Sequence, residues 1–331
     1  MKSVYGLFFL LLLTACAQQP VTSFPDPQNT YTPESVYRKV LPRYPEVRRV
    51  SADTPEGVAE FKNLTYVQYG RRALQLDLYA PASTMLEKRP VVVLVHGGGW
   101  RSGYRENMTP LAQQLALRGY VGVTVSYRLA GEARYPAAIH DVKAAIRWLR
   151  ANAESYGIDG DKIAVAGGSA GGQIASLVGV TAGMEQFDPG ARRSRISSDV
   201  QAIINIDGLS DFTSEAARLH EDDPCKNPSA AGFWFGGNYA EKTPLWHEAS
   251  PIYYVNKKTP PVLFIKSSES RFSVGQEEMS RLLDEYRVNN HVETFRNAPH
   301  SFWLLYPWMK PTATIIANFL DAQFAYRMTC H

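Results

Sequence analysis

Motifs for metal and nucleotide binding are missing from this chain of 331 residues. It contains neither H-E-x-x-H nor C-x-x-C, the spacings typical of zinc sites, and neither G-x-G-x-x-G nor G-x-x-x-x-G-K-[ST], the loops that hold phosphates. We therefore expect no metal site and no cofactor. The formal net charge of only +3 is dispersed along the chain, which argues against nucleic acid as a partner.

The apolar run near the N-terminus is too short to span a bilayer comfortably. It covers residues 4–13, follows Lys2, and has the length of the hydrophobic segment of a signal peptide. The run ends in Leu-Thr-Ala-Cys at residues 13–16, which resembles the lipobox of bacterial lipoproteins. This resemblance implies a signal peptide at 1–15, a lipidated Cys16, and an exported lipoprotein anchored in a membrane on the periplasmic side or at the cell surface. A plain signal peptide with an incidental cysteine is the alternative.

Residues 16–35 lack the pattern of a helix or a packed strand. Their stretch 18–33 is polar and carries four prolines, at positions 20, 25, 27 and 33. We expect a lipidated tether at 16–35 and one folded domain at 36–331, because this length is compatible with one large α/β domain carrying insertions.

Cysteine is scarce, with three in the chain. Setting Cys16 aside leaves Cys225 and Cys330, an even number in what would be an oxidising compartment. A disulfide between them is one interpretation, and two unpaired buried thiols are the other.

The clearest chemical signal is a serine among small residues. An apolar run at 163–166 leads into Gly-Gly-Ser-Ala-Gly at 167–171, which fits G-x-S-x-G with Ser169 at its centre. In that turn a strand stops, the serine takes a strained conformation and a helix begins at once, here predicted at 173–180. A chance occurrence or a phosphate-binding turn is the alternative, and the flanking strand and helix favour a nucleophile.

A second glycine motif follows another apolar strand. Residues 91–95 are continuously apolar and mostly β-branched, and they lead directly into His96 and three glycines. Glycines at the carboxyl end of a central strand leave amides that can approach a ligand closely. Together with a serine turn, such a loop indicates an oxyanion hole, for which we predict the amides of Gly98, Gly99 and Ala170. A merely flexible loop is the alternative.

Strands and amphipathic helices alternate through the chain. Residues 60–69 and 73–79 read as an antiparallel hairpin, and strands at 91–95, 120–127 and 163–166 alternate with helices at 111–118 and 137–154. This order predicts an α/β fold with a mostly parallel central sheet, helices on both faces, and ligands bound beyond the carboxyl ends of the strands.

Taken together, these motifs resemble the α/β-hydrolase fold. The segments that carry the resemblance are His-Gly-Gly-Gly-Trp at 96–100, Ser-Tyr-Arg-Leu at 126–129, Tyr-Pro-Ala-Ala at 135–138 and the serine turn. Within that fold the chain is similar to the carbohydrate-esterase and feruloyl-esterase-like group near the hormone-sensitive-lipase family, over about residues 60 to 325. The resemblance implies a serine carboxylic ester hydrolase.

The base and the acid of such an enzyme follow the serine along the chain. His300 lies between a strand at 292–295 and a terminal helix near 312–324, where this fold places its catalytic base. Relatives usually carry the acid after the penultimate strand, but Ser270 stands at the position of their aspartate. We predict Glu269, one residue earlier, as the acid, with Asp211 after the preceding strand as the alternative.

An insertion precedes the penultimate strand. About residues 208–259 separate the strands at 202–206 and 262–265, a length that suggests a lid or a specificity element. The insertion is rich in aromatic residues, which either stack on a sugar or an aromatic acyl group or fill a small core of their own; they are Phe233, Trp234, Phe235, Tyr239 and Trp246.

The sequence therefore predicts a serine ester hydrolase with Ser169 as nucleophile and His300 as base. The resemblance suggests small-molecule or carbohydrate esters, and acetyl or feruloyl esters of polysaccharides in particular, as substrates. Two other functions stay open: an aminopeptidase-like hydrolase of the same fold, and a binding lipoprotein that has lost catalysis.

Overall fold

The structure, a computed structural model, describes residues 30–82, 88–226 and 228–326. The predicted signal peptide, Cys16 and Cys330 lie outside these residues. Lipidation therefore stays a prediction, which mass spectrometry of the membrane-extracted protein would test.

Cys225 is exposed, and within the described residues it takes part in no disulfide. The bridge to Cys330 also stays a prediction, which alkylation of the unfolded, non-reduced protein would test.

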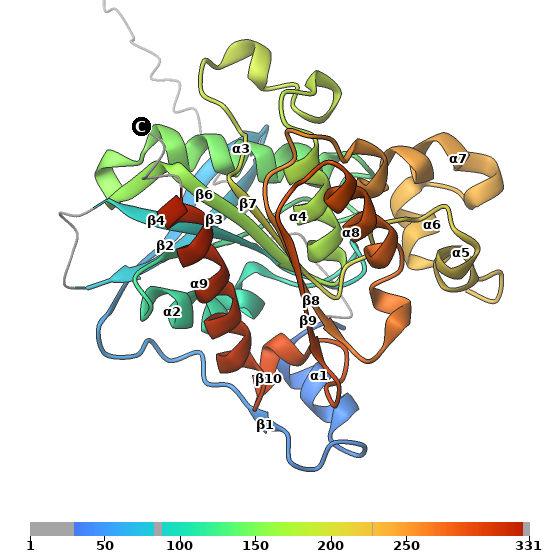
Figure 1. The fold of residues 1–331 in the computed structure, drawn as a ribbon, viewed down its shortest axis with the longest axis horizontal. Coiled ribbons are helices and arrows are strands. Elements are labelled where there is room, and N and C mark those ends of the chain that lie inside the picture. Colours follow the sequence, from blue (N-terminus) through green and yellow to red (C-terminus); the bar gives the residue numbers. More distant parts are fainter. Residues whose placement is uncertain (1–29, 83–87, 227, 327–331) are drawn as a thin grey trace, which may run out of the picture.

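An eight-stranded sheet forms the centre of the described fold (Figure 1). The strand order is β2-β3-β5-β4-β6-β7-β8-β9. The pairs β2–β3 and β3–β5 are antiparallel, and every pair from β5–β4 to β8–β9 is parallel. The strands are β2 (Val58–Tyr69), β3 (Arg72–Pro81), β4 (Arg89–Val95), β5 (Val121–Val125), β6 (Ile158–Gly168), β7 (Ala202–Ile206), β8 (Val262–Ser267) and β9 (Asn290–Phe295). The predicted hairpin and mostly parallel sheet are confirmed.

Helices cover both faces of this sheet, because the apolar side chains of its central strands point to both sides. One hydrophobic cluster lies beneath α3 (Ala137–Ala151), α4 (Ala170–Val180) and α8 (Gln276–Glu285). The opposite cluster lies beneath α1 (Pro33–Val40), α2 (Thr109–Ala116) and α9 (Met309–Tyr326). The two groups of helices lie on opposite sides of the sheet in Figure 1. This is the α/β-hydrolase architecture that the motifs indicate.

The N-terminal part of the described chain packs against the C-terminal part through strand pairing and buried apolar side chains. Strand β1 (Arg48–Arg49) pairs antiparallel with β10 (Leu305–Tyr306) in a separate two-stranded sheet. Val36 and Val40 of α1 are buried in the same hydrophobic cluster as Trp303 and Leu305. Helix α1 begins at Pro33, so its first residues belong to the stretch 16–35 that the sequence predicted as tether.

Where it is described, the insertion between β7 and β8 contains the α-helices α5 (Glu215–Glu221), α6 (Ala230–Phe235) and α7 (Tyr239–Glu248). Trp234 and Trp246 are fully buried, and Phe235 lies 4.9 Å from Trp246 between ring centroids. Phe212 meets Trp246 edge-on. Trp234 also stacks on Trp100, and Tyr135 contacts Trp234 and Phe235 edge-on. The buried aromatic residues of the insertion therefore pack against one another and into the main hydrophobic core, which is closer to the second of the two interpretations. In the described part of the chain, no helix combines the length and apolar character that crossing a membrane requires.

Candidate active site

Ser169 occupies the sharp turn between β6 and α4. Its backbone has φ 57° and ψ −125°, a conformation that non-glycine residues rarely adopt. Such strain costs on the order of 1–3 kcal/mol and persists where the surrounding structure requires it. Three other non-glycine residues with positive φ line the same cavity, namely Trp100, Asp207 and Ser301. Backbone strain is therefore concentrated at this edge of the sheet.

The glycines of the turn are required by close backbone contacts. A Cβ added at Gly171 would lie 2.2 Å from the carbonyl oxygen of Val95, and one at Gly167 would lie 2.1 Å from the carbonyl oxygen of Gly171. At Gly168, an added Cβ would lie 2.3 Å from the ring of Trp303. Helix α4 can follow β6 this tightly only because these positions lack side chains.

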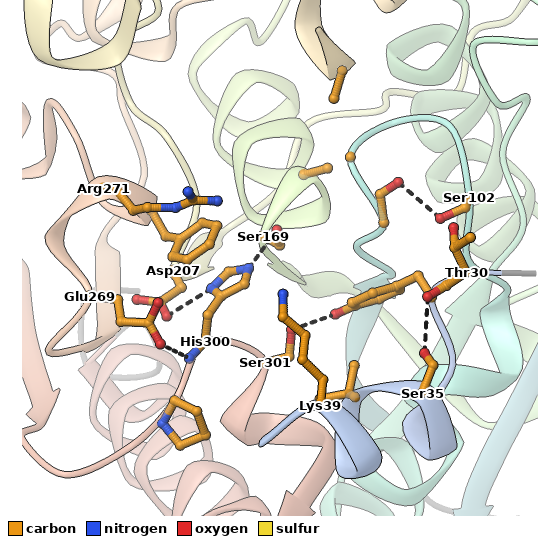
Figure 2. A pocket seen from close by; sticks show the side chains of 18 of the residues that line it. Thr30, Ser35, Lys39, Ser102, Ser169, Asp207, Glu269, Arg271, His300 and Ser301 are labelled. Carbon is orange, nitrogen blue, oxygen red and sulfur yellow. Dashed lines mark hydrogen bonds and ion pairs between the residues drawn. The ribbon is translucent and has the colours of Figure 1, made fainter. Parts of the chain in front are cut away.

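His300 bridges Ser169 and Asp207. Its Nε2 lies 2.9 Å from Oγ of Ser169, and its Nδ1 lies 3.1 Å from Oδ2 of Asp207. Figure 2 shows the three side chains in line, carried by the loops that follow β6, β7 and β9. The structure thus brings Ser169 and His300 together as the sequence predicts, and it adds a carboxylate that the sequence analysis did not assign.

The two predicted acids lie elsewhere. Oε1 of Glu269 accepts a hydrogen bond from the backbone N–H of His300, at 2.9 Å, rather than from its ring. Oδ1 of Asp211 accepts from the backbone and the hydroxyl of Thr213. The prediction that Glu269 or Asp211 meets the second ring nitrogen is therefore wrong, because Asp207 occupies that place directly after β7. Oδ1 of Asp207 accepts from the backbone N–H of Ser267, which fixes the carboxylate.

The protonation of His300 follows from its partners. A carboxylate accepts hydrogen bonds, so Nδ1–H donates to Asp207 and Nε2 is left to accept from the hydroxyl of Ser169. Burial lowers the pKa of His300, and the hydrogen bond and negative charge of Asp207 oppose that shift. The ring of Phe272 stacks on the imidazole with centroids 3.4 Å apart, which contributes to its burial. At neutral pH the imidazole is therefore uncharged and able to accept a proton.

Gly98, Gly99 and Ala170 line the same cavity as Ser169. Positive φ angles at Gly98 and Gly99, 120° and 58°, turn the loop after β4 back on itself, and Ala170 is the first residue of α4. Within the described residues, none of their three backbone N–H groups is paired with another protein group. Unpaired amides beside a serine are suited to binding a negatively charged oxygen.

The cavity measures about 390 Å³. Besides the residues above, it is lined by Glu221 and Ala230 from the insertion, by Glu269, Arg271 and Phe272 after β8, and by residues 30–40 at the start of the described chain. The insertion therefore supplies one wall, but its buried tryptophans do not reach the cavity. Where the chain is described, no group of three His, Cys, Asp or Glu side chains is placed to hold a metal ion.

Two residues of this site escaped the sequence analysis. Asp207 immediately follows the strand β7, and an acidic side chain at the carboxyl end of a parallel strand is the signal that could have identified it. Tyr31 lies in the proline-containing stretch that we predicted to be a tether. No pattern in that stretch indicates that Tyr31 lines the cavity.

Comparison with known families agrees with this geometry. Residues 76–285 match the BD-FAE family. The chain belongs to the BD-FAE family. The match includes Ser169 and Asp207 and ends before His300.

Similar proteins have esterase names. Esterase LipQ of Mycobacterium tuberculosis is 30% identical over 282 residues, which cover 82% of this chain and 64% of LipQ. This chain thus spans less than two thirds of the length of that relative. An esterase from the archaeon Pyrobaculum calidifontis superposes with a TM-score of 0.65 at 25% identity, covering 91% of this chain and 93% of the other. A truncated carbohydrate esterase from gut microbiota superposes with a TM-score of 0.66 at 20% identity, covering 83% and 99%.

The contact between Gly171 and the end of β4 yields a stability prediction. Replacing Gly171 by alanine should lower the free energy of unfolding by about 1–3 kcal/mol or more, because the new Cβ meets backbone atoms that cannot rotate away. Alanine is about 1 kcal/mol better than glycine inside a helix, so helix propensity cannot cause a loss. Urea unfolding measures the change.

Gly160→Ala is the matched control. Its Cβ would meet Cγ of Arg150 at 3.4 Å, and we expect stability within about 0.5 kcal/mol of the wild type. Equal stability of the two variants would show that the close contact at Gly171 is unimportant.

Proposed function

We propose that this protein is a serine carboxylic ester hydrolase with Ser169, His300 and Asp207 as its catalytic residues. The observation that carries the proposal is the continuous hydrogen-bonded chain from Oγ of Ser169 through the His300 ring to Oδ2 of Asp207. Membership of the BD-FAE family and the similarity to esterases such as LipQ support the same reaction class.

The geometry accounts for each step of acyl transfer. Nε2 of His300 takes the proton from Ser169 as Oγ attacks the ester carbonyl carbon, and Asp207 stabilises the imidazolium that forms. Negative charge develops on the carbonyl oxygen, where the amides of Gly98, Gly99 and Ala170 would receive it. The bond between the carbonyl carbon and the alkoxide oxygen then breaks, His300 gives its proton to that oxygen, the alcohol leaves, and an acyl-Ser169 ester remains. Water, deprotonated by His300, attacks that ester; the carboxylic acid is released and His300 returns the proton to Oγ of Ser169.

Each preorganised donor in such a hole contributes on the order of 3–4 kcal/mol to transition-state stabilisation. The contribution is large when such donors are held in place before charge develops, because no reorganisation is then needed during the reaction. Helix α4 adds to this effect, since its positive N-terminal end begins at Ala170.

We propose acetyl or feruloyl esters of polysaccharides as the substrate class. The structural similarity to a carbohydrate esterase from gut microbiota supports this choice, as does a cavity of about 390 Å³, which has room for a short acyl group and part of a sugar. Glu221 of α5 and Arg271 of the loop after β8 also line the cavity, and their polar side chains could form hydrogen bonds with sugar hydroxyl groups.

Site-directed variants test the catalytic assignment. Ser169→Ala should abolish turnover of p-nitrophenyl butyrate and labelling by a fluorophosphonate. Asp207→Asn should reduce kcat by up to ~10⁴-fold while the protein stays folded, because the amide oxygen is needed to accept from the backbone N–H of Ser267 and the NH2 group then faces Nδ1 of His300, which favours the wrong tautomer of the imidazole. Turnover and melting temperature are measured on the same preparations.

Glu269→Gln and Asp211→Asn are matched controls for the acid. Both substitutions keep an amide oxygen that can accept the hydrogen bond from His300 N–H or from Thr213, so turnover should stay within about tenfold of the wild type. Full activity of folded Asp207→Asn, together with loss in either control, would contradict the assignment.

The substrate class has its own test. Acetylated and feruloylated xylo-oligosaccharides should release acetate or ferulate with a higher kcat/KM than p-nitrophenyl butyrate, if contacts to the sugar contribute to transition-state binding. Liquid chromatography of the released acid measures both reactions. Turnover of the nitrophenyl ester with no release from either carbohydrate ester would remove the polysaccharide proposal and leave the reaction class intact.

The pH dependence follows from the lowered pKa of His300. The reaction needs the neutral imidazole, so kcat/KM should fall as the pH drops through the pKa of His300 in the free enzyme. Because burial lowers this pKa, the acidic limb should lie below 6.5, the ordinary value for histidine. In Asp207→Asn the residual activity should show a limb at still lower pH, since the negative charge that favours the imidazolium is gone.

His140→Gln controls for other titrating histidines. Burial also lowers the pKa of His140, but this residue lies on α3, outside the cavity. Its replacement should leave the profile unchanged. A wild-type acidic limb above pH 7 would be inconsistent with a His300 held neutral by burial.

A further inference from the structure

Residues 30–40 form one wall of the catalytic cavity although they precede the stretch that matches the BD-FAE family. Six of them line it, and they are Thr30, Tyr31, Ser35, Val36, Lys39 and Val40. Figure 2 shows Thr30, Ser35 and Lys39 around the cavity, on the other side of Ser301 from Glu269. The family match therefore does not include every segment that encloses Ser169.

This wall is held in place at several points. Nδ2 of Asn107, itself buried, donates to the backbone oxygen of Tyr31 at 3.0 Å. Val36 and Val40 pack into the hydrophobic cluster beside Trp303, three residues after His300. The pairing of β1 with β10 then joins the segment to the chain that follows His300. The position of Tyr31 is consequently coupled to that of the histidine loop.

The hydroxyl of Tyr31 lies close to the residues next to His300 and Ser169. It lies 3.1 Å from Oγ of Ser301, the residue after His300. A Cβ added at Gly97 would lie 3.1 Å from the same hydroxyl and 3.0 Å from Cβ of Ser169, so the hydroxyl and the nucleophile flank one bare glycine. Burial raises the pKa of Tyr31 well above its usual value, so the phenol is neutral at any pH at which the enzyme would act.

We propose that Tyr31 is a positioning residue for the catalytic serine and histidine, acting through its hydrogen bond to Ser301. Ser301 has φ 70°, a strained left-handed conformation immediately after His300, and its side chain is buried. A partner for its hydroxyl stabilises that conformation and thereby holds the imidazole against Ser169. Small displacements of catalytic groups cost large factors in rate, so this bond contributes to kcat.

The inference rests on the proposed ester hydrolysis, and a double-mutant cycle tests it. Tyr31→Phe, Ser301→Ala and the double variant are compared with the full-length wild type using p-nitrophenyl butyrate, with kcat, KM and melting temperature measured for each. Tyr31→Phe keeps the ring and removes only the hydroxyl. We expect kcat to fall about 10- to 30-fold, with KM within about threefold of the wild type.

Coupling between the two substitutions is the decisive readout. If the bond acts as described, the double variant should be no slower than the slower single variant, because each substitution removes the same interaction. Tyr37→Phe is the matched control on α1: its ring contacts the guanidinium of Arg49, 4.2 Å from the ring centroid, and does not line the cavity. This variant should keep wild-type kcat.

Three results would overturn the inference. Wild-type kcat in folded Tyr31→Phe would show that the hydroxyl is not needed, and multiplicative losses in the double variant would show that Tyr31 does not act through Ser301. A loss of melting temperature without a loss of kcat would make the role structural. If Tyr31→Phe does not fold, Ser301→Ala tests the same bond from its other end. Failure of the proposed function is distinguishable, since the wild type itself would then show no turnover.

Discussion

The candidate active site depends on close contact between backbone segments at glycine positions, where there is no room for a side chain. The end of β4, the turn at Ser169 and the start of α4 approach so closely that a Cβ at Gly97 or Gly171 would lie within 3 Å of a neighbouring carbonyl oxygen. This contact forces Ser169 into its strained conformation, which turns the hydroxyl away from the sheet and toward His300. Gly98, Gly99 and Ala170 line the same cavity as Ser169, so the close packing of β4, β6 and α4 gathers the proposed nucleophile and the proposed oxyanion donors at one site.

A parallel sheet explains how residues far apart in sequence meet there. The carboxyl ends of β4, β6, β7, β8 and β9 lie along one edge, and each is followed by a loop that contributes to the cavity. His300 and Asp207 are 93 residues apart, yet their loops follow strands separated only by β8. The insertion after β7 encloses another side of the cavity, and its Trp234 and Trp246 are buried in the hydrophobic cluster on one face of the sheet.

The carboxylate that meets the His300 ring could not be identified from sequence patterns alone. Resemblance to relatives directs attention to the loop after β8, where Glu269 is the available carboxylate. In the structure that carboxylate accepts from the backbone of His300, so it supports the histidine loop without meeting the ring. Asp207 is adjacent in space to the same loop through the hydrogen bond from Ser267. Both carboxylates follow the carboxyl end of a parallel strand, so that position marks them as candidates but does not tell which of them meets the ring.

The sequence by itself determined the fold class, the serine turn, the glycine loop and His300, because each depends on local chemistry: strand and helix periodicity, glycines that admit close contacts, and chain order. The same reasoning left open whether the aromatic residues of the insertion meet a ligand or one another. Tertiary structure decided that question, the identity of the carboxylate beside His300, and the place of Tyr31 in the cavity wall. These outcomes depend on distances between segments separated by tens to hundreds of residues, and such distances are set by packing rather than by any pattern along the chain.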